Sequence, residues 1–369
     1  MGLRALGFVA LLGMSMPAAS QDDPAPAKPE STSGSEITEA MQGAVERGLD
    51  WLARAQGRDG SFGSGSAPVA TTGLAGLAFL AGGHMPGRSK YGDNVKRCME
   101  YLIKHAGRNG YLNEGSGTQR GQGGSGMHGH GYAMLFLSQA YGMSDHLTAT
   151  EVEELKAVLT KAVRVSEQSQ VDNGGWNYEP NQQYDEGSVT ITQVQALRAV
   201  RNAGIRVNLT TIEKAVEYIN KVTTAEGQTQ YSLRGGGGGV RMTLTAAGMC
   251  AMTYLGDYSN PKITKGLKYL ITNCKPGTGS NTGEGAAWGQ WWFFYGNYYG
   301  TIAMYQAGGE YWSTWWPAVR EVLLKKQGSN GSWSGSESQQ YGAAFGTALA
   351  LITLQVPYRY LPILQRAQD

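Results

Sequence analysis

The sequence predicts an all-α protein, an (α/α)6 toroid in which six helix pairs close into a ring. Three observations predict this fold. A pair of helices joined by a glycine-rich segment recurs with a period of roughly 50 to 60 residues, close to the range typical of helical repeats. The first helix of each pair is amphipathic and the second is almost free of charge. Alternating half-buried and fully buried helices close most simply into two concentric rings.

Each unit contains the same parts in the same order. In the first unit, Val45, Leu49 and Leu52 share one helical face, as expected for a helix with one buried side. Its second helix includes residues 71–80, which carry no charge and must therefore be buried on most sides. The predicted outer helices are 44–55, 93–104, 151–168, 211–222, 262–272 and 316–326, and the predicted inner helices are 69–80, 127–141, 188–203, 240–255, 291–306 and 341–354.

An open solenoid is the alternative arrangement of these helices. A solenoid needs polar capping units, and neither the first nor the last unit has that character. In a ring, the long connections within units gather at one mouth, beside the N-termini of the inner helices. Free N–H groups and helix dipoles favour anions there. Because loops on a rigid scaffold usually carry function, we expect the functional residues at this mouth.

The first 38 residues differ in composition from the rest. Residues 1–20 have the pattern of a signal peptide: Arg4, an apolar stretch over 5–14, and small residues at 18–20. A buried N-terminal helix is the alternative interpretation. Residues 21–38 are rich in Pro, Ala, Ser and acidic side chains, which indicates a flexible linker. We therefore expect an exported, periplasmic or extracellular protein whose toroid domain spans 39–365.

Charge and cysteine content limit the function classes. The formal net charge is +2 and no basic patch is present, so nucleic-acid binding has no support. After the first twenty residues, no apolar stretch is long enough to span a bilayer. Cys98, Cys250 and Cys274 are an odd number for an exported chain, so at least one is free or pairs with another molecule. Cys250 and Cys274 could form a disulfide, or all three could be buried thiols.

A short motif recurs in the connecting segments. Residues 170–176 and 327–333 fit the pattern Gln, three residues, Gly, one residue, Trp, and 56–62 fits it with Phe in place of Trp. A Gln amide can bond free backbone groups at a helix end while the aromatic ring packs over the next unit. We therefore predict a structural clamp between repeats.

This motif resembles the QW repeat of squalene and hopene cyclases, whose fold is shared with protein prenyltransferase β subunits. Segments 127–142, 174–178, 308–312 and 357–362 are similar to exported bacterial proteins called squalene-cyclase-like or prenyltransferase-like. The resemblance covers about residues 40–365 and implies the toroid fold. It implies activity much less directly, since those proteins mostly carry the name by fold.

The catalytic signatures of that superfamily are missing. Hopene cyclases use an acid in an Asp-x-Asp-Asp motif, which this sequence lacks. Asp185 and Glu186, just before the third inner helix, are the nearest acidic pair. If both are buried, one could have a raised pKa and act as a catalytic acid. The alternative is a helix N-cap beside a carboxylate that the helix dipole favours.

A zinc site of the prenyltransferase type is not predicted either. Its candidates would be His128, His130, Asp185 and Cys250, but their spacing matches no strong zinc pattern. We predict no metal and no cofactor, and we interpret both histidines as structural or mouth-lining residues.

An aromatic concentration, residues 291–299, opens the fifth predicted inner helix. Facing the cavity, these rings could bind an apolar ligand or stabilise a carbocation; facing outward, they would pack between the two rings of helices. Two arginines flank a run of glycines at the fourth mouth loop, as anion contacts or as solvated surface charges. The predicted ligand-binding residues are His128, His130, Tyr132, Arg234, Arg241, Trp291, Trp292, Tyr295 and Tyr298.

Two functions from different classes fit this sequence. The first is an exported binding or scaffold toroid that receives an apolar or anionic ligand, or a protein partner, at the mouth. The second is a terpenoid-cyclase-like enzyme, of isomerase or lyase type, acting on an apolar isoprenoid. An aromatic cavity with one buried carboxyl favours the enzyme, and a cavity filled by side chains favours the scaffold.

Overall fold

Helices account for the regular secondary structure of the part of the chain that the structure describes. The structure is a computed structural model and describes residues 36–63, 67–113, 126–181, 183–234, 239–277 and 292–365. They belong to one compact unit, Ser33–Asp369. Within these ranges there are two isolated β-bridges, Thr223 with Thr229 and Gln230 with Val240, and no strand. None of the described helices has the length and apolarity needed to cross a membrane.

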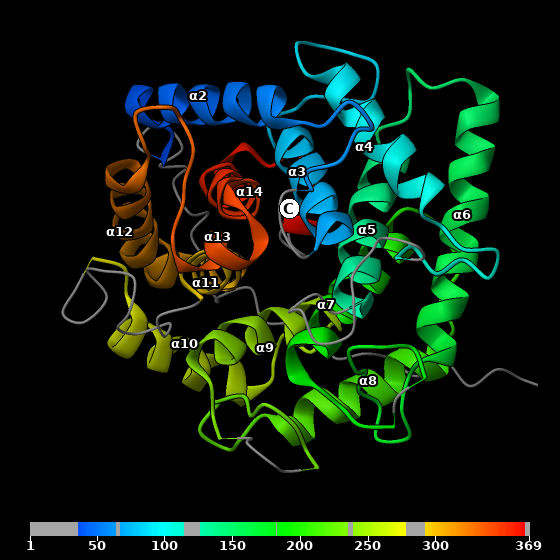
Figure 1. Ribbon diagram of the computed structural model, residues 1–369. Coiled ribbons are helices and arrows are strands. Elements are labelled where there is room, and N and C mark those ends of the chain that lie inside the picture. The colour runs from blue at the N-terminus through cyan, green and yellow to red at the C-terminus, as the bar shows by residue number, and fades with distance from the viewer. Residues whose placement is uncertain are drawn as a thin grey trace, which may run out of the picture. The chain divides into compact units, whose positions relative to one another are not determined.

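Six described helices form an inner ring (Figure 1). Their residues are almost all buried, because the sequences are apolar or small on every face. Consecutive inner helices pack side by side, and the last packs against the first, so the ring is closed. The inner helices are α3 (Pro68–Ala81), α5 (Gly126–Tyr141), α7 (Gly187–Asn202), α9 (Met242–Tyr254), α11 (Phe293–Ala307) and α14 (Ala343–Leu354).

Six further described helices surround the inner ring and run along its outside (Figure 1). Each buries one face and leaves the other in solvent. Side chains at the N-terminal ends stabilise several of them: Thr148 and Glu151 form a capping box, and Asn208 and Asn260 accept backbone N–H groups. The outer helices are α2 (Glu39–Ala55), α4 (Gly92–Lys104), α6 (Ala149–Gln168), α8 (Leu209–Val222), α10 (Pro261–Cys274) and α12 (Gly309–Lys326).

The three Gln-containing turns each connect their own unit to the next one. The Gln170 side-chain amide donates to Gly174 O in its own turn (3.0 Å) and to Thr211 O in α8 (2.9 Å). Gln56 makes the same pair of bonds to Gly60 O and Asn94 O, and Gln327 to Gly331 O and Ala44 O. The bond from Gln327 to Ala44 joins the last unit to the first. The closed ring predicted from the sequence is confirmed, and the open solenoid is excluded.

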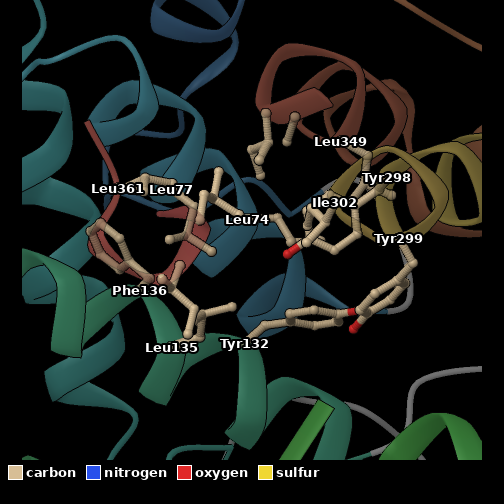
Figure 2. Packing of buried hydrophobic residues seen from close by; sticks show 14 of the residues in the cluster. Leu74, Leu77, Tyr132, Leu135, Phe136, Tyr298, Tyr299, Ile302, Leu349 and Leu361 are labelled. Carbon is tan, nitrogen blue, oxygen red and sulfur yellow. The ribbon is translucent and has the colours of Figure 1, made fainter. Parts of the chain in front are cut away.

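The middle of the ring is filled by side chains (Figure 2). Gln195 of α7 reaches past α9 to α11, where its amide donates to the Tyr298 hydroxyl (2.8 Å) and accepts from the Tyr299 hydroxyl (3.2 Å). Figure 2 shows Tyr132 of α5 pointing toward Tyr299 from across the ring. The C-terminal segment, red in Figure 1, turns back into the ring, and its Leu361 is buried there (Figure 2).

Three predicted helix boundaries were wrong. Helix α2 begins five residues earlier than expected, because the Thr38 hydroxyl caps it by accepting the Met41 N–H. Helix α12 begins at Gly309 and includes Pro317, since the buried Trp312 extends its apolar face backward. Gly342 has a φ of +85° and separates the short helix α13 (Ser336–Tyr341) from α14.

Candidate functional site

The N-terminal ends of the inner helices gather at one mouth of the ring. Here the charge of Glu186, at the start of α7, raises the pKa values of Tyr178, Tyr231 and Tyr295, after the larger effect of burial. These tyrosines come from the turn before α7, the segment before α9 and the first turn of α11. The mouth therefore brings together aromatic hydroxyls from three units around one buried carboxyl.

Asp185 has a structural role at this mouth. Its carboxylate accepts hydrogen bonds from the Leu233 N–H (2.7 Å), the Tyr218 hydroxyl (2.9 Å) and the Asn173 amide (2.9 Å). Burial alone would raise the pKa of this carboxyl, but the hydrogen bonds outweigh it and hold the pKa below the ordinary value. Asp185 is therefore an ionised anchor that ties the segment before α9 to α8 and to the third turn.

Glu186 has the opposite environment. Its side chain is buried, and Oε2 accepts from the Val189 N–H (2.8 Å) and the Ser188 hydroxyl (2.6 Å), which makes it the N-cap of α7. Oε1 has no hydrogen-bond partner within 3.5 Å among the described residues. Burial raises the pKa of this carboxyl. The bonds from Ser188 and Val189, with a smaller contribution from the nearby Tyr231 hydroxyl, offset the effect only in part. A proton on Glu186 would sit on Oε1, because Oε2 already accepts two donors.

Ser188 links Glu186 to His128 at the start of α5. The Ser188 oxygen lies 3.1 Å from His128 Nε2 while its hydroxyl donates to Glu186. His128 is half-buried, and burial lowers its pKa to about 4, so the ring is neutral near pH 7. This is not the Ser-His-acid order of hydrolases, in which the acid bonds the histidine. The chain instead connects a buried carboxyl, through a hydroxyl, to a half-buried imidazole.

Aromatic rings surround this carboxyl. The hydroxyls of Tyr178 and Tyr231 are hydrogen bonded to each other across the mouth. Trp292 is 39% exposed and lies 5.9 Å from the Tyr295 ring and 6.5 Å from the Tyr341 ring, measured between centroids. The Tyr295 hydroxyl is buried and has no hydrogen-bond partner in the described residues. These rings offer a partly apolar aromatic surface at the mouth, in which the Tyr295 hydroxyl has no partner among the described residues.

A second buried carboxylate lies at the start of α11. Glu337, on α13, accepts the backbone N–H groups of Phe294 (2.9 Å) and Tyr295 (3.0 Å). It therefore caps α11 from another unit and fixes the position of the first turn that carries Tyr295. Sequence reasoning did not identify Glu337, Ser188, Tyr178 or Tyr231, because their importance depends on which loops meet.

His130 lies away from the mouth, although it is only two residues from His128. Its Nδ1 accepts the Leu112 N–H (3.1 Å), and Nε2 lies 3.1 Å from Ala162 O and 3.2 Å from the Ser166 hydroxyl. It is fully buried, and burial lowers its pKa to about 4. In other units a threonine fills the same place: Thr190 accepts the Trp176 N–H, and Thr347 accepts the Trp333 N–H. His130 thus anchors the second turn.

The remaining predicted ligand-binding residues are not all on the mouth surface. Tyr132 and Tyr298 are buried in the middle of the ring, below the mouth. Arg241 is exposed at the rim, where its charge lowers the pKa of Tyr231 against the larger effect of burial. Arg234 is exposed and its guanidinium donates to Gln183 O (2.8 Å). Trp291 lies outside the described residues.

The four candidate zinc ligands do not form a metal site. These candidates are His128, His130, Asp185 and Cys250. Cys250 is buried in α9, and its thiol donates to Tyr299 O (3.2 Å). Within the described ranges, no group of three His, Cys, Asp or Glu side chains could hold a metal ion. Cys98, Cys250 and Cys274 are all buried and unbridged, so the structure has no disulfide between Cys250 and Cys274.

Solved structures with the same architecture are found, although their sequences are distant. A protein from Actinoplanes matches with a TM-score of 0.59 and 14% identity, over 86% of this chain and 99% of the other. D-Mannose isomerase matches with a TM-score of 0.57 and 12% identity, over 87% and 98%. Type II terpene cyclase MstE from Scytonema, in complex with its substrate geranylgeranyl dihydroxybenzoate, matches with a TM-score of 0.55 and 14% identity, over 87% and 98%.

The chain has the α/α toroid fold. This architecture is shared with terpene cyclase and sugar isomerase enzymes, and the likeness shows the fold alone. No protein-family model matches the sequence, and no curated protein is similar to it. Function must therefore be argued from the mouth itself.

Proposed function

We propose that the mouth is an acid–base site of the terpenoid-cyclase type, at which Glu186 gives a proton to an apolar substrate. One observation carries this proposal: a buried carboxyl with a raised pKa keeps one oxygen without a partner, among aromatic rings from three units. A carboxyl whose pKa is raised by burial is suited to general acid catalysis.

The surrounding residues have distinct parts in this proposal. Tyr295, Trp292 and Tyr341 supply aromatic faces that can stabilise positive charge formed after protonation. Ser188 keeps Oε2 occupied and leaves Oε1 to carry the proton. The substrate cation is discharged by loss of a proton to water, and Glu186 regains its proton from water. Asp185, the other predicted acid, is a positioning residue, because its hydrogen bonds keep it ionised.

The filled ring limits how a substrate binds. Gln195, Tyr298 and Tyr299 cross the axis below the mouth, so a long chain cannot lie along it. The substrate would lie across the mouth, against Trp292 and Tyr178, which are 39% and 38% exposed. MstE, with the same fold, has been crystallised with a geranylgeranyl substrate, which makes isoprenoids the first class to test.

Deuterium incorporation tests the proposal directly. The purified protein would be incubated in D2O with squalene or geranylgeraniol, and products analysed by mass spectrometry. A proton delivered to carbon adds one deuterium per turnover. Glu186→Gln should abolish incorporation, whereas Ser138→Ala, a buried change elsewhere on α5, should leave it unchanged. Incorporation that survives Glu186→Gln would assign the acid to another group.

A ligand-binding scaffold is the second candidate, and the filled axis favours it. On this proposal the mouth holds an apolar ligand or a protein segment without reaction. Native mass spectrometry and lipid extraction of the purified protein would then find a bound compound that returns unchanged and without deuterium. We further propose that residues 1–20 are a signal peptide, that 21–38 tether the domain and that the protein is exported; N-terminal sequencing of the mature protein tests this.

A further inference from the structure

A polar cavity lies at the other end of the ring, opposite the mouth. Its volume is about 190 Å³, and it opens where the C-terminal ends of α7, α9 and α11 meet the segment that follows α14. By volume it has room for a molecule of roughly six to ten non-hydrogen atoms. Its lining residues are Arg198, Asn202, Thr253, Tyr254, Tyr258, Gln306, Pro362, Ile363 and Gln365.

Arg198 is the one charged residue among those that line this cavity. It is half-buried, and within the described residues its guanidinium makes no hydrogen bond and no ion pair. Asp257 is the acidic residue next in sequence to the lining residue Tyr258. Its carboxylate accepts hydrogen bonds from the amides of Asn220 and Asn260 instead. A fully buried arginine is normally paired with an anion, because desolvation of the charge is otherwise unfavourable. The half-buried Arg198 is therefore placed to pair with an anion that enters the cavity from solvent.

The helix ends do not replace that anion. Helix C-termini carry negative partial charge on their free carbonyls. Here α7 ends in a Schellman motif, in which the Ile205 N–H bonds Val200 O and the Gly204 N–H bonds Arg201 O. Helix α9 ends in the same way, with Gly256 at the left-handed position. Backbone groups therefore already occupy these carbonyls.

We propose that this cavity binds a small hydroxylated carboxylate, with Arg198 as the group that pairs with its anion. A planar guanidinium fork matches the two oxygens of a carboxylate. The polar residues Thr253, Tyr258 and Asn202 line the rest of the cavity and suit the hydroxyl groups of such a ligand. The buried Ile363 and Tyr254 give the site an apolar floor.

Isothermal titration calorimetry of the full chain with malate, citrate, inorganic phosphate and glycerol tests this proposal. Malate or citrate should bind, and Arg198→Gln should weaken binding by about tenfold or more, as expected for the loss of a charge-assisted hydrogen bond. Arg201→Gln is the matched control, since Arg201 lies on the same last turn of α7, is exposed and does not line the cavity. It should change binding by less than about twofold.

A second variant keeps the test informative if Arg198→Gln disturbs folding. Asn202 is exposed at the rim, so Asn202→Trp should narrow the opening and weaken binding while the thermal unfolding midpoint stays close to that of the wild type. Glu186→Gln should not alter anion binding, because the mouth is a separate site. The proposal is overturned if no carboxylate binds, if phosphate and carboxylates weaken equally in both arginine variants, or if glycerol binds as well as malate.

Discussion

Asp185 and Glu186 are consecutive residues, yet their carboxyls have pKa values shifted in opposite directions. Asp185 accepts three hydrogen bonds, from Leu233, Tyr218 and Asn173, which hold its pKa low despite burial. Glu186 has one oxygen without a partner, and burial raises its pKa. The groups that face these two neighbouring carboxyls therefore favour the ionised form of Asp185 and the protonated form of Glu186.

The first prediction concerns the stability of isosteric variants of this pair. Asp185→Asn should lower the free energy of unfolding at pH 7 by about 2–3 kcal/mol, because charge-assisted hydrogen bonds are lost. This loss should shrink as the pH falls through the native pKa of Asp185, since a lowered pKa stabilises the fold only while the group is ionised. Urea unfolding at several pH values measures it.

Glu186→Gln should behave in the opposite way. Because the pKa of Glu186 is raised in the fold, the wild type loses stability as the pH rises through that value. Glutamine retains an oxygen for the Val189 N–H and does not ionise, so the variant should gain stability relative to the wild type as the pH rises above 4.5 and through the native pKa of Glu186. If the two stability curves remain parallel, Glu186 does not carry a raised pKa.

The second prediction concerns the link from Ser188 to Glu186. The Ser188 hydroxyl bond lowers the pKa of Glu186 against the larger effect of burial, so Ser188→Ala should raise that pKa further. NMR titration of ¹³C-labelled glutamate side chains would follow the change. Ser138→Ala is the control, since the Ser138 hydroxyl donates to Leu135 O within α5 and the change should leave the titration of Glu186 as it is.

The third prediction compares two glycines with positive φ. Gly174 has a φ of +91°, and a Cβ there would lie 2.1 Å from Lys214 O in α8. Gly204 has a φ of +82° but open space around its Cα. Gly204→Ala should cost about 1–2 kcal/mol for backbone strain alone. Gly174→Ala should cost about 3 kcal/mol or more, because the turn must also move away from α8. Equal costs, measured by denaturant unfolding, would mean that the turn is loosely docked.

The fold followed from the sequence because its signals are local and repeated. Helix α10, for example, has Ile263, Leu267 and Leu270 on one face, and all three are buried. The glycine at the turn of each unit could be found by the same repetition. The roles of the site residues depend on contacts between units. The sequence located Asp185 and Glu186 but could not predict their opposite pKa shifts, because Leu233 and Tyr231, which contribute to those shifts, come from the next unit.

Distance in sequence also hid what lies inside the ring. The sequence predicted Tyr298 as a ligand-binding residue, but nothing local indicates that Gln195, 103 residues away, bonds its hydroxyl. The different positions of His128 and His130 could not be predicted from the sequence either. The two residues share one short motif, yet His128 lies at the mouth beside Ser188 and His130 lies behind it, under Leu112.

The last prediction uses His130 to test that anchoring role. Since burial lowers its pKa from 6.5 to about 4, the neutral ring stabilises the fold fully above pH 6.5. That contribution falls as the pH drops toward 4, by roughly 3 kcal/mol in total. His130→Asn keeps an acceptor for the Leu112 N–H but does not titrate, so the variant should lose about 3 kcal/mol less than the wild type over this range.

Thr347→Val is the matched variant for the anchoring role alone. Thr347 accepts the Trp333 N–H at 2.9 Å, as His130 accepts the Leu112 N–H, but it carries no titrating group. Its loss should lower stability by about 1–3 kcal/mol at pH 7.5 and at pH 5 alike, because a buried N–H is left without an acceptor. A pH-dependent cost for Thr347→Val, or a pH-independent one for His130→Asn, would show that the acid sensitivity of the fold arises elsewhere than at His130.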